Sequence, residues 1–336
     1  MENNKLVESI LSELALGSLV SPVVNVTGGL MHKIICAETT TGKYAIKLLN
    51  PAIMKRPDVF DNYKVAEHLE GVLQLNHIPI VPALIFDGKK MQRINNQYFY
   101  VYNWVDGKAL RSDEIKQEHC KLMGSILARI HKIEQRDEDF NGGEISIDWD
   151  FYIHAAHKNC PEIVNVLKEN KKLLYEAQKL GNTAIKRIPK IAVISNGDMD
   201  SKNVLWVKGE PIIIDLECLK YGNPYRELFQ LALYWSGYDC CRIDYKLLNT
   251  FVKAYVHVYG DFDVNWEDLY YCNYELLEWL EYSVKRALMI ECDGDEERQL
   301  GIEQTHFTMD KIIYYHSIRE ELIESINQRT KESGFN

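Results

Sequence analysis

Three polar residues, Asp198, Asn203 and Asp215, interrupt strand-forming runs in the segment 193–217, which reads VISNGDMDSKNVLWVKGEPIIIDLE. Two carboxylates and an amide oxygen that converge form an unfavourable cluster unless a divalent cation neutralises them. Hard oxygen ligands of this kind suit Mg²⁺, particularly Mg²⁺ that is also held by substrate phosphates. The alternative interpretation is that the three residues are unrelated turn caps.

A β-hairpin would bring these residues together. The runs VLWV and IIID favour strands, and KGEP between them supplies turn residues. If Val207 pairs with Ile212, the hairpin opens where Asn203 and Asp215 meet. Asp198 then lies on a loop that enters the same end.

The elements before this hairpin divide the chain into two parts. Residues 1–102 are mostly strand-forming around one helix, in the order strand, strand, helix, strand, strand. Helical periodicity dominates after about residue 112. The sequence VDGKAL marks a junction between the two. We therefore expect an N-terminal lobe (1–102), a hinge (103–107) and a C-terminal lobe (108–336).

Composition excludes several classes of protein. The 336 residues carry a net charge of -10 without a long basic run, which argues against nucleic-acid binding. No stretch approaches the roughly 18–20 apolar residues that a membrane span needs. The acidic, interrupted start is not a signal peptide, so a cytoplasmic location is expected. The eight cysteines form no Cys-x-x-Cys pair and are expected to be reduced.

The pattern Asp-x4-Asn followed by Asp-x-Glu, here Asp198, Asn203 and Asp215-Leu216-Glu217, resembles the aminoglycoside phosphotransferase and choline kinase superfamily. The resemblance implies an α+β, bilobal protein kinase-like fold, with a small antiparallel-sheet-plus-helix lobe and a larger, mainly helical lobe. It implies that Asp198 is the catalytic base and that Asn203, Asp215 and Glu217 bind Mg²⁺. One departure is Asn196, where the family usually has histidine; its amide is expected to organise the loop by hydrogen bonding.

The same resemblance implies a nucleotide site in the N-terminal lobe, for ATP or GTP. Lys47 of YAIK would reach the phosphates, and an unpaired ammonium on that strand needs an anion. The anion is expected to be a helix glutamate, with Glu67 preferred over Glu70. The remaining nucleotide-binding residues implied by the family are Gly28, Gly29, Ala45, Asn103 and Val105. His131 and Glu227 are expected to have structural roles.

The acceptor is expected to bind to the late helices. Tyr271, Glu275, Glu278 and Tyr282 are spaced four, three and four apart, which would place them on one helical stripe. A mixed aromatic and acidic stripe suits a cationic small molecule, although a solvated helix face would have the same pattern.

The resemblance therefore implies a small-molecule kinase that phosphorylates a hydroxyl group of a cationic acceptor. Aminoglycosides, and with them antibiotic resistance, are the first expectation; choline or another amino alcohol is the second. A nucleotide-binding pseudokinase or structural protein is the alternative from another class, because Asn196 departs from the family pattern.

Overall fold

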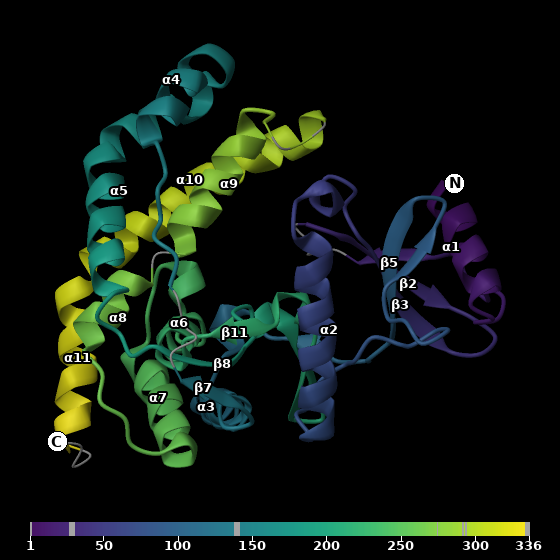
Figure 1. The fold of residues 1–336 in the computed structure, drawn as a ribbon, viewed down its shortest axis with the longest axis horizontal. Helices are drawn as coiled ribbons and strands as arrows, with labels where there is room; N and C mark the ends of the chain where they lie inside the picture. The colour runs from purple at the N-terminus through teal and green to yellow at the C-terminus, as the bar shows by residue number, and fades with distance from the viewer. Residues whose placement is uncertain are drawn as a thin grey trace. The chain divides into compact units, whose positions relative to one another are not determined.

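The structure, a computed structural model, describes residues 2–26, 31–137, 142–273, 275–290, 292 and 294–332 (Figure 1). The chain divides into two compact units. The first comprises Met1–Ala109 and Lys202–Lys220, and the second comprises Leu110–Ser201 and Tyr221–Asn336. The first unit thus includes the hairpin that follows Asp198 in the sequence. The hinge expected at 103–107 remains a prediction.

A five-stranded antiparallel sheet forms the centre of the first unit. Its strands lie in the order β1-β2-β3-β5-β4. Their bounds are Val24–Val26 (β1), Lys33–Glu38 (β2), Lys43–Leu48 (β3), Gln92–Ile94 (β4) and Gln97–Asn103 (β5). Ile46 of β3 pairs with Ile35 on one side and Val101 on the other. Because side chains alternate between faces, these three residues line one face, and Lys47 belongs to the other.

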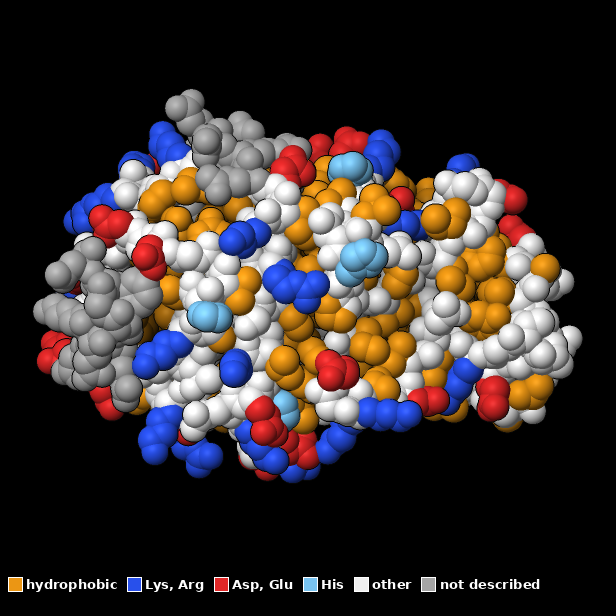
Figure 2. Space-filling view, turned by 90° about the horizontal axis from the view of Figure 1, so that it is seen from below, with side chains coloured by type: hydrophobic (Ala, Val, Ile, Leu, Met, Phe, Trp, Pro, Cys, Tyr) orange, Lys and Arg blue, Asp and Glu red, His pale blue; other side chains and the backbone are white. Residues whose placement is uncertain are grey.

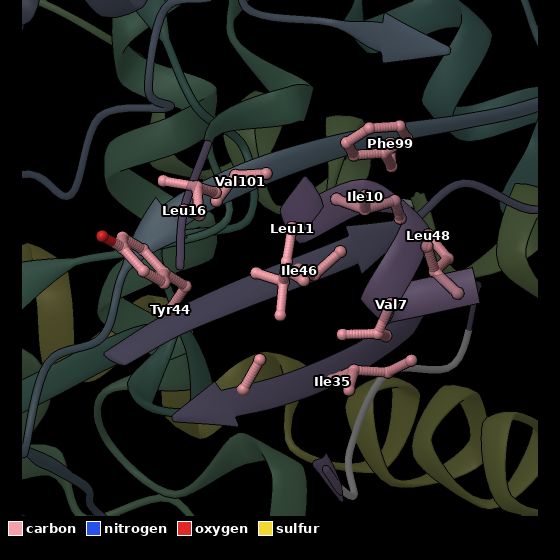
Figure 3. Packing of buried hydrophobic residues seen from close by; sticks show 11 residues of the cluster. Val7, Ile10, Leu11, Leu16, Ile35, Tyr44, Ile46, Leu48, Phe99 and Val101 are labelled. Carbon is pink, nitrogen blue, oxygen red and sulfur yellow. The ribbon is translucent and has the colours of Figure 1, made fainter. Parts of the chain in front are cut away.

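Helix α1 (Glu2–Glu13) covers the face that contains Ile46. Its residues Val7, Ile10 and Leu11 are spaced three and one apart and pack against Ile46 in the cluster drawn in Figure 3. The expectation of a single helix in this part of the chain was therefore wrong. A short amphipathic segment gives a weak signal in isolation, because most of its stability comes from packing on the sheet.

The opposite face packs against α2 (Val59–Leu75), after the short 3₁₀ helix η1 (Ile53–Lys55). A second buried cluster fills this side, and it consists of Leu49, Ile53, Met54, Val59, Tyr63, Ala83 and Tyr100. Lys47 is therefore a charged residue on a largely apolar face. Its exposed fraction is 5%.

The predicted hairpin is present but in a different register. Strands β9 (Val204–Val207) and β10 (Glu210–Ile213) pair with Val207 opposite Glu210, not Ile212. The turn is therefore only Lys208-Gly209, with φ of 53° and 90°. Two successive positive φ angles are typical of the tight turns that match strand twist. Pro211 is accommodated because β10 is an edge strand in the sheet β10-β9-β6, where β6 is Lys108–Ala109.

The second unit is mainly helical. Its helices are α3 (Gln117–His131), α4 (Trp149–Asn159), α5 (Val164–Ala184), α6 (Pro224–Tyr234), α7 (Tyr245–Tyr259), α8 (Trp266–Cys272), α9 (Glu275–Ala287), α10 (Asp295–Ser317) and α11 (Arg319–Glu332), with 3₁₀ turns at Ser112–Glu114, Pro161–Ile163 and Tyr238–Cys240. A small sheet, β11-β8-β7, contains Lys220–Gly222 (β11), Ile191–Ser195 (β8) and Gln135–Asp137 (β7). Helices α3 and α7 approach closely at Gly124, where an added Cβ would lie 2.4 Å from the carbonyl oxygen of Phe251.

The surface drawn in Figure 2 has a mixed character. Lysine and arginine side chains are scattered among acidic and apolar ones, without a continuous basic stripe on this face. Among the described residues, no helix combines the length and apolar character that crossing a bilayer requires. The eight cysteines are all free thiols.

Candidate active site

Lys47 forms the centre of a buried charged cluster in the first unit. Its Nζ atom lies 2.6 Å from Oδ1 of Asp215 and 2.5 Å from Oε2 of Glu217. Strand β3 presents Lys47, and the turn after β10 presents both carboxylates. Burial alone lowers the pKa of Lys47, but the charges and hydrogen bonds of the two carboxylates outweigh burial, so the pKa is raised. The ammonium is therefore kept charged.

The helix glutamates have other partners. Glu67 accepts hydrogen bonds from the hydroxyl group of Tyr100 (2.8 Å) and the backbone N–H of Met91 (3.2 Å). Glu70 forms an ion pair of 2.7 Å with Lys90. The expected pairing of Lys47 with Glu67 is thus corrected in this structure. The periodicity of α2 locates both glutamates on the helix. It cannot show that the carboxylates paired with Lys47 come instead from the distant hairpin.

Glu217 is held from two sides. Its Oε1 atom lies 3.2 Å from Nε2 of His32, and its Oε2 atom faces Lys47. Burial raises the pKa of Glu217, whereas the hydrogen bond from His32 and the charge of Lys47 lower it, with a net decrease to about 2. The carboxylate is therefore ionised over the whole physiological range of pH. His32 was not anticipated, because nothing in the sequence links a histidine before β2 to position 217.

Asp215 and Asn203 lie at the open end of the β9–β10 hairpin. The backbone N–H of Ile214 donates to the carbonyl oxygen of Asn203 at 2.9 Å, so Asp215 is the next residue beyond the last pair. Asp215 has a φ of 60°, a left-handed conformation that few non-glycine residues adopt. This strained backbone turns the chain from β10 into the 3₁₀ helix η5 (Leu216–Cys218), which carries Glu217.

The donor set fits a hard divalent cation. Asp215 and Glu217 supply carboxylates and Asn203 an amide oxygen, which are ligands that Mg²⁺ accepts together with phosphate oxygens. The buried Oε2 atom of Glu217 makes an ion pair with Lys47 at 2.5 Å. Within the same residues, no three His, Cys, Asp or Glu side chains form a metal site by themselves. Oxygen atoms of Asn203 and of a bound phosphate would complete the set of ligands that Asp215 and Glu217 begin.

The loop that contains Asp198 belongs to the second unit. It follows β8, and its backbone is held by Glu227 of α6, whose Oε1 atom accepts the N–H groups of Asn196 and Gly197 at 2.9 Å each. Trp235 donates its indole N–H to the carbonyl oxygen of Met199 at 3.0 Å. Asp198 itself is partly exposed. The loop is thus fixed on both sides of Asp198 by groups from the same unit.

Asn196 differs from the expectation. Its side chain is 3% exposed, and neither its Oδ1 nor its Nδ2 atom has a hydrogen-bond partner among the described residues. The prediction that this amide organises the loop was wrong, because the backbone N–H of Asn196 provides the contact instead. His131 is fully buried and hydrogen-bonded to Glu227, which agrees with the structural roles expected for both.

The other residues predicted to bind nucleotide lie in separate segments of the first unit. Gly28 and Gly29 lie outside the described residues. Ala45 is on the same face of β3 as Lys47. Asn103 ends β5 opposite Tyr44, and Val105 accepts a hydrogen bond from the backbone N–H of Gly107 at 2.9 Å. These roles in binding nucleotide stay predictions.

The predicted acceptor stripe is not one continuous helix. Tyr271 belongs to α8, which ends at Cys272, whereas Glu275, Glu278 and Tyr282 belong to α9. Periodicity alone did not reveal the break near Asn273, the C-cap of α8.

Cations of the protein itself contact both aromatic residues of the stripe. The guanidinium of Arg319 lies 5.4 Å from the ring centroid of Tyr271, and that of Arg286 lies 5.4 Å from that of Tyr282. The side chain of Glu275 lies outside the described part. Recognition of an acceptor by this stripe stays a prediction.

The chain is similar to known proteins in both sequence and fold. Residues 36–270 match the model of the phosphotransferase enzyme family. A spectinomycin phosphotransferase solved with ADP and spectinomycin is 13% identical, with a TM-score of 0.68 over 93% of this chain and 98% of that one. An ethanolamine kinase from Plasmodium vivax is 17% identical, with a TM-score of 0.55 over 85% and 81%.

A third similar structure is the amicoumacin kinase solved with AMP-PNP and Ca²⁺, which is 13% identical, with a TM-score of 0.58 over 93% and 96% of the two chains. Comparison with curated proteins finds no match. The fold expected from the sequence, bilobal and kinase-like, is confirmed by these similarities.

Proposed function

The chain belongs to the phosphotransferase enzyme family, and on this basis we propose that it transfers the γ-phosphoryl group of ATP to a hydroxyl group of a small molecule. The cluster of Lys47, Asp215 and Glu217 is the observation that carries the proposal. A buried lysine between two carboxylates, on the third strand of a kinase-like sheet, has the composition of a site for phosphate and a divalent cation.

Each residue has a distinct role in the proposed reaction. The acceptor oxygen forms a bond to the γ-phosphorus, the bond from that phosphorus to the bridging oxygen of the β-phosphate breaks, and Asp198 takes the hydroxyl proton. Lys47 binds the α- and β-phosphates. Asn203, Asp215 and Glu217 would hold Mg²⁺, which neutralises phosphate charge when bound.

The choice of donor is supported by the relatives. The spectinomycin phosphotransferase was solved with ADP and the amicoumacin kinase with AMP-PNP and Ca²⁺, so an adenine nucleotide and a divalent cation are the first to test. We take ATP as the donor and GTP as the alternative, with Asn103 and Val105 at the adenine edge. A cytoplasmic location, where nucleoside triphosphates are supplied, completes the proposal.

We propose an amine-bearing acceptor, of the aminoglycoside type first and of the amino-alcohol type second. The similar structures are named for spectinomycin, amicoumacin and ethanolamine. The net charge of -10 favours attraction of a cation. Glu275 and Glu278 are the proposed amine-binding members of the stripe, because a carboxylate attracts a cationic group.

A phosphorylation screen tests this function. Purified protein is incubated with Mg²⁺ and γ-labelled ATP or GTP, together with aminoglycosides, choline, ethanolamine or amine-free sugars, and labelled products are separated. We expect label on a hydroxyl group of an amine-bearing compound and a preference for ATP. Label only on amine-free acceptors would contradict the acceptor class, and no acceptor-dependent transfer at all would contradict the function.

A further inference from the structure

His32 is a buried residue that the proposed reaction does not use. It lies in the turn before β2, and its exposed fraction is 7%. Both ring nitrogens have contacts: Nδ1 accepts the backbone N–H of Asn50 at 3.0 Å, and Nε2 lies 3.2 Å from Oε1 of Glu217 and 3.4 Å from the hydroxyl oxygen of Tyr63. The ring thus connects the end of β3, helix α2 and the turn that carries Glu217.

These contacts determine the tautomer of His32. A backbone N–H can only donate, so Nδ1 must carry a lone pair and no proton. The ring proton is therefore on Nε2, which faces the carboxylate of Glu217. A carboxylate only accepts, so the two groups match, and the Asn50 contact fixes the direction in which the Nε2–H group points.

The two carboxylate oxygens of Glu217 have different partners. Oε1 accepts the hydrogen bond from the ring, while Oε2 faces Lys47 at 2.5 Å. Burial raises the pKa of Glu217, and among the influences that lower it the hydrogen bond from His32 is the largest. The Glu217 carboxylate is therefore held by His32 at one oxygen and by Lys47 at the other.

We propose that His32 is a positioning residue whose Nε2–H group orients the Glu217 carboxylate to bind a divalent cation. The inference rests on the proposed function, because it takes Glu217 as a metal ligand. Groups that hydrogen-bond to a metal ligand typically change metal affinity by about 10–100-fold when they are removed. A histidine that only fills space between α2 and the sheet would lower stability without changing metal affinity.

The test measures binding of Mn²⁺ in the presence of AMP-PNP, by electron paramagnetic resonance of free Mn²⁺, together with the thermal midpoint of each variant. We expect His32→Leu to weaken Mn²⁺ binding by about 10-fold or more. His32→Gln, whose amide can donate to Glu217, should recover most of the affinity. Tyr63→Phe is the matched control; it removes the weaker 3.4 Å contact and should leave Mn²⁺ affinity unchanged.

A folded His32→Leu variant with wild-type Mn²⁺ affinity would overturn the proposal. If the variants fail to fold, nitrogen NMR of ¹⁵N-histidine-labelled wild type tests the tautomer of His32 directly. A protonated Nδ1 at position 32 would contradict the proposal. Glu217→Gln separates this inference from the proposed function. Unchanged Mn²⁺ affinity in Glu217→Gln would remove Glu217 from the metal ligands, whereas a loss there with no loss in His32→Leu would reject only the role of His32.

Discussion

His131 Nε2 lies 2.9 Å from Oε2 of Glu227, and the two side chains are 0% and 3% exposed. The other oxygen of Glu227 accepts the backbone N–H groups of Asn196 and of the glycine that follows it. His131 Nδ1 lies 2.8 Å from the hydroxyl oxygen of Tyr255. A hydrogen-bonded chain from α7 through α3 and α6 therefore holds the loop that presents Asp198.

Breaking this chain should destabilise the second unit. His131→Leu removes the hydrogen-bond partner of Oε2 in the buried carboxylate of Glu227, and breaking a buried pair of this kind costs about 3–5 kcal/mol. We expect a loss of that size in the free energy of unfolding, measured by urea denaturation. His306→Leu, on the exposed side of α10, is the control and should change stability by about 0.5 kcal/mol or less. Equal effects of the two substitutions would contradict a special role for His131.

The same pair predicts a dependence of stability on pH. Burial raises the pKa of Glu227, but the hydrogen bond and charge of His131, together with hydrogen bonds from Ser195 and Gly197, outweigh burial, and the pKa is lowered. Stability from such a group is present above the unfolded value of about 4.3 and is lost as pH falls through the folded value. The stability difference between wild type and Glu227→Gln should therefore shrink below about pH 4. Urea titrations at pH 7, 5 and 3.5 test this, and a constant difference would contradict it.

Much of this arrangement was predictable, because the signals are local. Lys47 lies within the strand-forming run KYAIKL, which is β3. The pattern Asp-x4-Asn with Asp-x-Glu marks the residues that follow β8 and β10. Periodicity of α2 located Glu67 on a helix. These patterns involve residues that are close in the sequence, and the structure contains the strands and the helix that they predict.

Other features depend on contacts between distant segments. The pairing of Lys47 with Asp215 and Glu217, and the contact of His32 with Glu217, join residues from separate hairpins, so no periodicity specifies them. The register of the β9–β10 hairpin is set by the two-residue turn Lys208-Gly209, whereas the prediction used the four residues KGEP as the turn. A C-cap at Asn273 divided the predicted acceptor stripe between two helices.

The Lys47 cluster predicts a large effect of removing one cation. Lys47→Met leaves two adjacent carboxylates without their buried partner, and it removes the group proposed to bind phosphates. We expect phosphotransfer to fall by about 10²-fold or more, with weaker ATP binding by calorimetry. Lys43→Met, at the exposed start of the same strand, removes an exposed pair with Asp106 and a cation–π contact with Trp104, and it should retain activity. Similar activity in both variants would contradict the proposed role of Lys47.

Two glycines in helices provide a test of the packing. Gly124→Ala should destabilise the protein by about 1–3 kcal/mol, because its Cβ would lie 2.4 Å from the carbonyl oxygen of Phe251. Gly71→Ala in α2 meets nothing within 4 Å and should stabilise it by about 0.5–1 kcal/mol. Chemical denaturation of both variants checks the prediction. A neutral Gly124→Ala would show that α3 and α7 separate without cost.

Phosphoryl transfer by this protein, as proposed, depends on Asp198 as the base that takes the proton of the acceptor hydroxyl group. The most direct measurement compares acceptor-dependent phosphoryl transfer in wild type and Asp198→Asn, at saturating Mg²⁺ and nucleotide, with thermal midpoints to confirm folding. Removal of a general base should lower kcat by about 10²–10⁴-fold with little change in nucleotide affinity. Equal kcat in the two folded proteins would contradict the catalytic role assigned to Asp198.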